Sequence, residues 1–229
     1  MKRIILALLI VVSPALSAFC QKPNLGFSVS VLNDIDWNKP MADFQYTISN
    51  MSLQSDHPLK FGLCFEEKFR TVSPSINLNL IYRNIKYSEH YAPLTNFNHF
   101  TMELPLNFSF RKSIQDETSL MMNIGGGCTY NFSTNKFQAG VLRNDTLVYS
   151  FNLVNTNKIS AFINGGIGIE CSLEKLGSLQ FKLEYCYQFS KQLQYKHTDR
   201  YFNQITNKYR MNYASLGFVY YFPICKKTN

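Results

Sequence analysis

Residues 179–189 of this chain, LQFKLEYCYQF, alternate strictly between two kinds of side chain. The odd positions are large and apolar or aromatic, and the even positions are polar or small. Because successive side chains of a β-strand point to opposite faces, this segment has one apolar face and one polar face. Its length matches the roughly 9 to 11 residues with which a tilted strand crosses a bilayer. The pattern therefore predicts a membrane-spanning strand.

Seven further segments carry the same alternation, which predicts eight strands in all. In the clearest of them, every even position from Phe100 to Phe110 is large and apolar, and the odd positions between them are polar or small. Glycine runs near 125–127 and 165–168 match no phosphate-binding motif, so we interpret them as room for neighbouring strands in a narrow, curved barrel. The seven segments lie near residues 24–33, 59–67, 75–87, 99–111, 118–132, 158–173 and 212–222.

The connections between these segments alternate in length. Outer-membrane barrels have an even number of strands, long external loops and short periplasmic turns. If the N-terminus is periplasmic, every long connection lies on the external side of the outer membrane. We therefore predict an all-β fold, an eight-stranded antiparallel up-and-down transmembrane β-barrel. The long connections are 34–58, 88–98, 133–157 and 190–211, and the short ones are 68–74, 112–117 and 174–177.

Two soluble folds compete with this prediction. A secreted β-sandwich also uses alternating strands, and a lipocalin-like barrel also has eight of them. The sandwich does not require the alternation of long and short connections or the aromatic residues at segment ends. The lipocalin-like barrel would need a polar outer face and an apolar cavity. The pattern therefore favours the membrane barrel.

The first 18 residues have the features of a secretory signal peptide: a basic start, an apolar stretch and small residues before a cut after Ala18. A lipoprotein signal acylated at Cys20 is the alternative, but bulky Phe19 stands where such signals need a small residue. No later apolar run approaches the roughly 18 residues of a transmembrane helix. The mature chain, 19–229, is predicted to be a single barrel domain with periplasmic N- and C-terminal tails.

The composition agrees with a strand-rich amphipathic protein, because 15% of the residues are aromatic and only 17% are charged. Without Lys2 and Arg3, 21 basic residues face 15 acidic ones, a net charge of +6. No recognisable nucleic-acid-binding motif accompanies this charge. Phosphorylated lipid headgroups are therefore the expected anionic partners, and no cofactor or metal site is predicted.

Three stretches of sequence resemble the PorT-like outer-membrane β-barrel family of Gram-negative bacteria. They are MELPLNFSF at 102–110, GGIGIECSL at 165–173 with the LQFKLEYCYQFS that follows a short turn, and NYASLGFVYYF at 212–222. The resemblance is one of pattern and spacing over nearly the whole mature chain, and it brings no catalytic signature. It implies an eight-stranded outer-membrane barrel and, by analogy with some relatives, a role in protein secretion. The chain departs from the usual form by continuing past Phe222 with PICKKTN.

Strand parity places seven charged residues inside the predicted barrel. The lumen of an eight-stranded barrel is filled by side chains, and a buried ion must be paired or hydrated. These residues are expected to form a structural ion-pair plug, with a gated pore or a proton path as the alternative. They are Lys60, Glu66, Arg83, Glu103, Glu170, Lys182 and Glu184.

Four histidines, His57, His90, His99 and His197, lie in or beside predicted external loops. Barrel enzymes place acid and base residues at the outer rim, so a lipid-modifying enzyme is one alternative function. A soluble secreted β-protein is another. The spacing of the histidines forms no catalytic motif, and we predict a non-enzymatic protein.

The last long connection is strongly basic and contains tyrosines. Basic groups just above a membrane would contact lipopolysaccharide phosphates, and tyrosine rings would lie at the interface. The alternative is an ordinary solvated loop. The expected partners are therefore outer-membrane lipids and lipopolysaccharide, or a protein of the envelope or secretion machinery. The candidate contact residues are Lys191, Lys196, Arg200, Lys208 and Arg210.

Six cysteines in an exported chain permit disulfides but do not require them. Closing the barrel would bring the start of the first strand beside the end of the last. Cys20 and Cys225 lie a few residues beyond those ends, so we hypothesise a Cys20–Cys225 disulfide on the periplasmic side. Strand parity predicts that Cys64 and Cys186 point inward. The same parity predicts that Cys128 and Cys171 face the lipid and pack there as small apolar side chains.

Overall fold

The computed structural model describes residues 24–35, 52–69, 72–89, 92–132, 135–141, 147–173, 176–198 and 204–222. The predicted signal peptide at 1–18 and the predicted Cys20–Cys225 disulfide lie outside these residues, as do His90 and Arg200. The described residues form twelve β-strands. None of them belongs to a helix long and apolar enough to cross a membrane.

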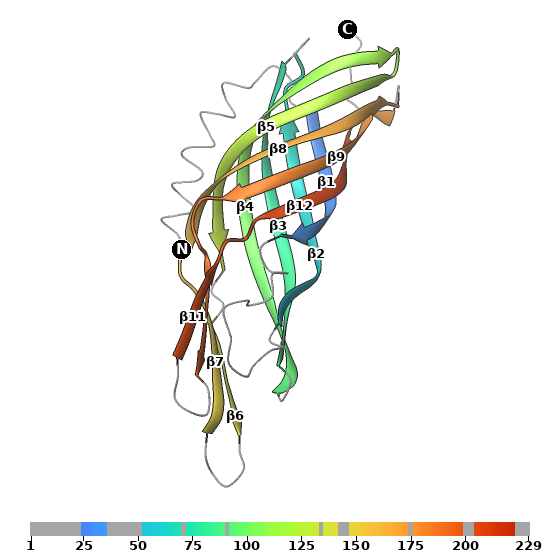
Figure 1. Ribbon diagram of the computed structural model, residues 1–229. Helices are drawn as coiled ribbons and strands as arrows, with labels where there is room; N and C mark the ends of the chain where they lie inside the picture. Colours follow the sequence, from blue (N-terminus) through green and yellow to red (C-terminus); the bar gives the residue numbers. More distant parts are fainter. Residues whose placement is uncertain are drawn as a thin grey trace.

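Eight of the twelve strands close into one barrel (Figure 1). The last strand pairs with the first, and every neighbouring pair around the ring is antiparallel. Closure leaves no free strand edge in the barrel. The predicted eight-stranded antiparallel barrel is therefore confirmed. In ring order its strands are β1 (Asn24–Asp34), β12 (Tyr213–Tyr221), β9 (Ser178–Gln188), β8 (Ile159–Ser172), β5 (Thr118–Asn131), β4 (Ala92–Gln115), β3 (Val72–Glu89) and β2 (Ser52–Glu66).

The two faces of the barrel wall differ in the way that the alternation predicts. On β9 the outward Phe181 is 52% exposed, whereas the inward Gln180 is 0% exposed. On β4, Phe108 is exposed and its neighbour Asn107 is buried. The outer surface is therefore apolar and the interior is polar. This distribution is the reverse of that expected for a lipocalin-like soluble barrel.

Glycines allow β4 and β5 to approach each other closely. A Cβ atom at Gly127 would lie 2.1 Å from the carbonyl oxygen of Leu104. A Cβ atom at Gly125 would lie 2.0 Å from Oδ1 of Asn107. Because no side chain fits at either position, this glycine run leaves room for the adjacent strand, as its sequence predicts.

The two ends of the barrel are built differently. At one end, which we call the turn end, short connections of residues 67–71, 116–117 and 173–177 join β2 to β3, β4 to β5 and β8 to β9. Gly177 adopts a φ of 103° there, which favours glycine. At the opposite end, which we call the hairpin end, the connections from β5 to β8 and from β9 to β12 carry further strands. The turn end is at the top of Figure 1 and the hairpin end at the bottom.

The four remaining strands form a second sheet beyond the hairpin end, which we call the extension (Figure 1). One hairpin is inserted between β5 and β8 and another between β9 and β12. The two hairpins join because β7 pairs with β10. In the order β11-β10-β7-β6, the strands are β11 (Gln204–Tyr209), β10 (Leu193–Thr198), β7 (Leu147–Asn155) and β6 (Asn135–Val141).

The extension corrects the prediction that 133–157 and 190–211 are loops. The prediction for 88–98 is also wrong, because β3 and β4 remain paired as far as Glu89 and Ala92. Most of 34–58 lies outside the described residues, but β2 already begins at Ser52. These strands were missed because, outside the barrel wall, pairing between strands does not require one apolar and one polar face.

Candidate functional site

A continuous apolar surface surrounds the barrel, and we call it the apolar belt. No acidic or basic residue occupies an outward position in the middle of the eight described barrel strands. Soluble monomers rarely expose contiguous apolar patches larger than a few hundred Å². Members of the belt come from all eight strands, among them Phe27, Phe61, Leu80, Phe108, Met122, Ile167, Phe181 and Phe218.

Aromatic pairs border the belt at both ends. At the turn end, the rings of Tyr220 and Phe222 meet edge to face, with centroids 5.3 Å apart. Aromatic girdles of this kind lie at the two interfaces of membrane barrels. Three pairs border the hairpin end: Tyr82 with Phe100 (5.2 Å), Tyr130 with Phe132 (5.3 Å) and Tyr187 with Phe189 (5.7 Å).

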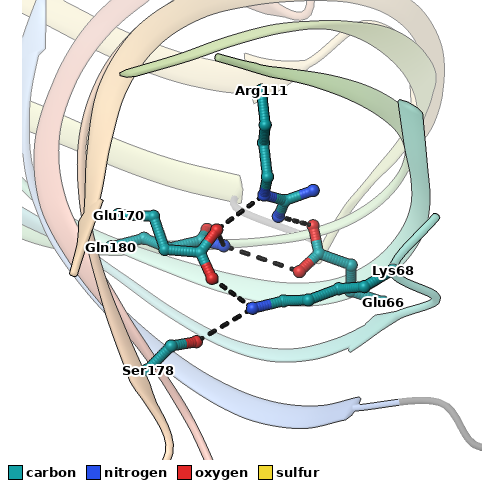
Figure 2. Close-up of polar contacts among 6 residues, drawn as sticks. All are labelled: Glu66, Lys68, Arg111, Glu170, Ser178 and Gln180. Atoms are coloured by element: carbon teal, nitrogen blue, oxygen red, sulfur yellow. Dashed lines mark hydrogen bonds and ion pairs between the residues drawn. The ribbon is translucent and has the colours of Figure 1, made fainter. Parts of the chain in front are cut away.

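Inside the barrel, an ion-pair network closes the turn end (Figure 2). Arg111 of β4 lies at its centre. Its Nε donates to Oε2 of Glu170 at 2.6 Å, and its Nη2 donates to Oε1 of Glu66 at 2.5 Å. Glu66 belongs to β2 and Glu170 to β8, and neither strand is a neighbour of β4. The guanidinium group therefore links opposite parts of the barrel wall across the lumen.

Three more side chains complete this network. Lys68 donates to Glu170 and, at 3.1 Å, to Oγ of Ser178. Gln180 donates from Nε2 to Glu170 at 3.2 Å and to Glu66 at 3.5 Å. Both carboxylates are therefore held by several donors each, which offsets the cost of removing them from water.

A second group of contacts fills the middle of the lumen. Lys60 of β2 forms an ion pair with Glu184 of β9, with Nζ 3.2 Å from Oε2. Asn123 of β5 donates to the other oxygen of Glu184 at 3.0 Å. Lys60 also donates to Oγ of Ser215 on β12 at 3.4 Å. Four strands are thus tied together by one buried ion pair and its neighbours.

A third group lies nearer the hairpin end and is arranged around Tyr213. Its hydroxyl donates to Oε2 of Glu103 at 2.6 Å. The guanidinium carbon of Arg83 lies 5.6 Å from the centre of the Tyr213 ring, and Nζ of Lys60 lies 5.3 Å from it. Arg83 is itself paired with Asp34, with Nε 3.1 Å from each carboxylate oxygen. One aromatic ring therefore contacts two cations.

All seven predicted charged residues lie at inward positions of the barrel strands. Only two of them, Lys60 and Glu184, form an ion pair with each other. Lys182 is partly exposed at an inward position of β9. The other four meet partners that the sequence reasoning missed: Asp34, Lys68, Arg111 and Tyr213. Asp34 and Arg111 continue the inward parity of their strands at the ends, which is the signal that would have identified them. Lys68 has the same signal, because it lies two positions past the inward Glu66, although it follows the end of β2.

Positive and negative charges are balanced in the described lumen, with five basic and five acidic side chains. One cavity in the lumen has a volume of about 20 Å³ and is lined in part by Lys60, Glu103 and Glu184. That volume holds about one water molecule. The ten charged residues are Lys60, Lys68, Arg83, Arg111 and Lys182, with Asp34, Glu66, Glu103, Glu170 and Glu184.

The predicted basic contact residues fall into two groups. Lys191 and Arg210 lie in connections between the barrel and the extension, whereas Lys196 and Lys208 lie on β10 and β11. The register, with Lys196 opposite Thr206 and Gln194 opposite Lys208, places the two lysines on the same face of the extension. Both are exposed. Arg200 lies outside the described residues.

The described histidines lie on three different strands. His99 is buried in the wall of the barrel on β4, and His197 lies on β10 of the extension. The backbone of His57 lies on β2, and His90 is not among the described residues. In the described parts of the chain, no group of three or more His, Cys, Asp or Glu side chains is arranged to hold a metal ion.

The four described cysteines are free thiols. Cys64 and Cys186 are buried inside the barrel, as strand parity predicts. Cys128 is exposed on the outer surface and Cys171 is partly exposed. The first pair therefore lies on the inner face of the barrel wall and the second pair on the outer face, and each cysteine packs there as a small side chain.

Comparison with known proteins gives structural likeness alone. No protein-family model matches the chain, and no curated protein matches it, so the resemblance to the PorT-like family gains no support. Among solved structures, the chain is similar to a major outer membrane protein from Thermus thermophilus, with 12% identity, a TM-score of 0.47 and coverage of 86% of this chain and 99% of that one.

Two other solved structures are also similar. One is outer membrane protein H (OprH) from P. aeruginosa, with 15% identity, a TM-score of 0.39 and coverage of 87% of this chain and 99% of that one. The other is the COG4313 outer membrane channel from Pseudomonas putida F1, with 8% identity, a TM-score of 0.37 and coverage of 87% and 96%.

Proposed function

We propose that this protein is an outer-membrane β-barrel that acts as a sealed, non-enzymatic anchor and presents its extension for binding. The observation that carries the proposal is the apolar belt, which surrounds a closed barrel with a polar interior. In water this distribution would expose apolar side chains of all eight strands. In a bilayer the same side chains meet lipid, and closure satisfies the backbone hydrogen bonds.

The proposed orientation follows from the difference between the two ends. Bacterial outer-membrane barrels have short periplasmic turns and longer external segments. The turn end therefore faces the periplasm, and the hairpin end with its extension faces outward. Signal-peptide cleavage after Ala18 would leave the N-terminal tail on the periplasmic side, as the sequence analysis predicts.

The contents of the lumen favour an anchor over a pore. Arg111 joins two carboxylates across the turn end, and Lys60 and Glu184 pair in the middle. A conducting path would have to break these contacts and leave buried charges unpaired, which costs several kcal/mol for each ion. The inward charges are therefore best explained as the structural plug that holds the wall together.

The extension is the proposed binding element. It projects beyond the barrel and carries exposed Lys196 and Lys208 on one face. Its partner is either lipopolysaccharide or a protein of the envelope, and a secretion-associated partner is the one that the PorT-like resemblance suggests. Loops and additions at one end of a rigid scaffold commonly carry the function of such proteins.

The location is tested by outer-membrane fractionation and by electrophoresis with and without heating. A membrane barrel stays folded in detergent at room temperature and changes its migration when it is boiled. Unchanged migration, together with recovery in the soluble fraction, would contradict the membrane proposal.

The sealed lumen is tested by single-channel recording of the purified protein in a planar bilayer. We expect a flat current trace. Regular conductance steps would contradict the anchor proposal and would support the alternative of a gated pore.

A further inference from the structure

Three connections between the barrel and the extension lie side by side, and each contains one basic residue. They are residues 156–158 before β8, 189–192 after β9 and 210–212 before β12, and these three barrel strands are neighbours in the ring. Their basic residues are Lys158, Lys191 and Arg210, which we call the collar. Lys158 and Lys191 are exposed, and Arg210 is partly buried.

Hydrogen bonds fix the three connections against one another. The carbonyl oxygen of Lys191 accepts from Oγ1 of Thr156 at 2.8 Å and from Nδ2 of Asn157 at 2.9 Å. The carbonyl of Gln192 accepts from the amide of Thr156 at 2.8 Å, and the amide of Gln192 donates to the carbonyl of Tyr209 at 2.9 Å. The collar therefore has a defined backbone framework that joins all three connections.

The collar lies at the edge of the apolar belt. Lys158 directly precedes the outward Ile159, and Lys191 follows the outward Phe189 by two positions; both apolar side chains are exposed. The guanidinium carbon of Arg210 lies 5.3 Å from the centre of the Tyr187 ring, within the aromatic border of the belt. In the proposed membrane orientation, the three cations lie at the level of the lipid headgroups.

The charge of this region has one sign. The three connections contain no acidic residue. Neighbouring strands are about 4.8 Å apart, so the backbones that carry the three cations lie within roughly 10 Å along the rim. Stacking on Tyr187 holds the Arg210 guanidinium group at the border of the apolar belt.

We propose that the collar binds the phosphate groups of a phosphorylated glycolipid in the outer leaflet, the chemistry that lipopolysaccharide provides. This inference rests on the proposed membrane location and assigns the lipid contact to Lys158, Lys191 and Arg210. Basic residues at a membrane surface are attracted to anionic lipid, and arginine recognises phosphate through a pair of hydrogen bonds.

The same geometry separates the collar from Lys196 of the extension. Lys196 is seven positions beyond Phe189 along the chain. At about 3.3 Å per residue, an extended strand places it up to roughly 23 Å past the edge of the belt. Lys196 therefore lies beyond the phosphate layer and is left for a different partner, whereas Lys208 is only two positions from Arg210.

The test uses the full mature protein in zwitterionic detergent micelles, with native mass spectrometry of bound lipid. Lipid A that carries its phosphates is compared with dephosphorylated lipid A and with inorganic phosphate. The collar variant is K158Q/K191Q. The matched control, K112Q/K196Q, removes the same charge from exposed lysines at the turn end and on the extension.

We expect the collar variant to weaken binding of phosphorylated lipid A at least tenfold, and the control to change it less than twofold. We expect wild-type protein to bind dephosphorylated lipid A no better than the collar variant binds phosphorylated lipid A. Equal loss in both variants, or equal binding of the two lipids by wild-type protein, would overturn the proposal. Competition by submillimolar inorganic phosphate would identify a free-phosphate site in place of a lipid site.

Heat-dependent migration of every variant distinguishes failure of the lipid contact from failure of the membrane barrel. If the barrel folds in the membrane and only the collar results fail, the lipid contact is wrong and the proposed anchor remains. If wild-type protein forms no membrane barrel, the proposed function fails first and the collar inference fails with it.

Discussion

The barrel and the extension are both antiparallel β-structure from one chain, but they differ in whether their sheets have edge strands. The barrel closes on itself and has no edge, whereas β6 and β11 are edges of the four-stranded extension. In addition, side chains such as Arg111 cross the lumen and join strands that are not neighbours. Closure and the lumen network therefore stabilise the barrel. Substitutions on the open sheet are expected to leave the stability of the barrel unchanged.

The strongest test of this difference is Arg111→Ala in the lumen. Removing the guanidinium group leaves Glu66 and Glu170 without their shared partner, and breaking a buried ion pair in this way costs about 3–5 kcal/mol. We expect a loss of this size in the free energy of unfolding, measured by urea titration in detergent micelles. The triple change Glu66→Gln, Arg111→Met, Glu170→Gln removes these three charges together and should recover most of the loss, because the remaining Lys68 is exposed to solvent. A wild-type unfolding curve for Arg111→Ala would mean that the network does not hold the wall.

A charge on the apolar belt is expected to have the next largest effect. Ile167 is 59% exposed in the middle of β8, and arginine at the midplane of a membrane barrel costs about 2–4 kcal/mol. Ile167→Arg should therefore lower the free energy of unfolding in lipid bilayers by that amount. Thr206→Arg, at an exposed position of the extension, is the matched control and should leave it unchanged. Equal effects at the two positions would remove the distinction between the regions.

Tyr213→Phe tests one hydrogen bond within the lumen. It removes the donor that lies 2.6 Å from Oε2 of Glu103 and leaves the buried carboxylate with less support. The expected loss is about 1–3 kcal/mol in the free energy of unfolding. Tyr220→Phe removes a hydroxyl that donates to the carbonyl of Leu176 on the exposed surface, and its effect should be smaller. The two losses are compared by parallel urea titrations, and a larger loss for Tyr220→Phe would reverse the expected order.

The smallest effect is expected for Lys196→Gln on the extension. Surface substitutions away from packed or paired groups usually change stability by less than about 0.5 kcal/mol. We expect the unfolding midpoint of the barrel and its heat-dependent migration to remain at the wild-type values. A loss comparable to that of Tyr213→Phe would mean that the extension and the barrel unfold as one cooperative unit.

The barrel was predictable from sequence because a membrane and a polar lumen impose opposite requirements on alternate residues. The segment 179–189 shows this directly, since its odd positions face outward and its even positions face inward. The same rule gave the inward positions of Lys60, Glu103 and Glu184. The pairs themselves were harder to predict, because Arg111 contacts residues 45 and 59 positions away on strands that are not its neighbours.

The extension was not predictable in the same way. Its strands are short, as in NKFQAGV at 135–141 and LQYKHT at 193–198, and neither shows a long alternation. The sheet also depends on the pairing of β7 with β10, which joins two insertions separated by two barrel strands in the sequence. Periodicity within one segment contains no information about such a pairing. The collar was missed for the same reason, because only the fold brings Lys158 beside the connections of Lys191 and Arg210.

The contacts of β12 have a consequence for the order of biogenesis. Ser215 and Tyr213 lie on this final strand, and they support Lys60 and Glu103, which belong to strands made much earlier. Until β12 is in place between β1 and β9, Lys60 lacks the hydroxyl of Ser215 and Glu103 lacks the hydroxyl of Tyr213. Completion of the ring therefore also completes the hydrogen bonds to two buried charged side chains that earlier strands carry.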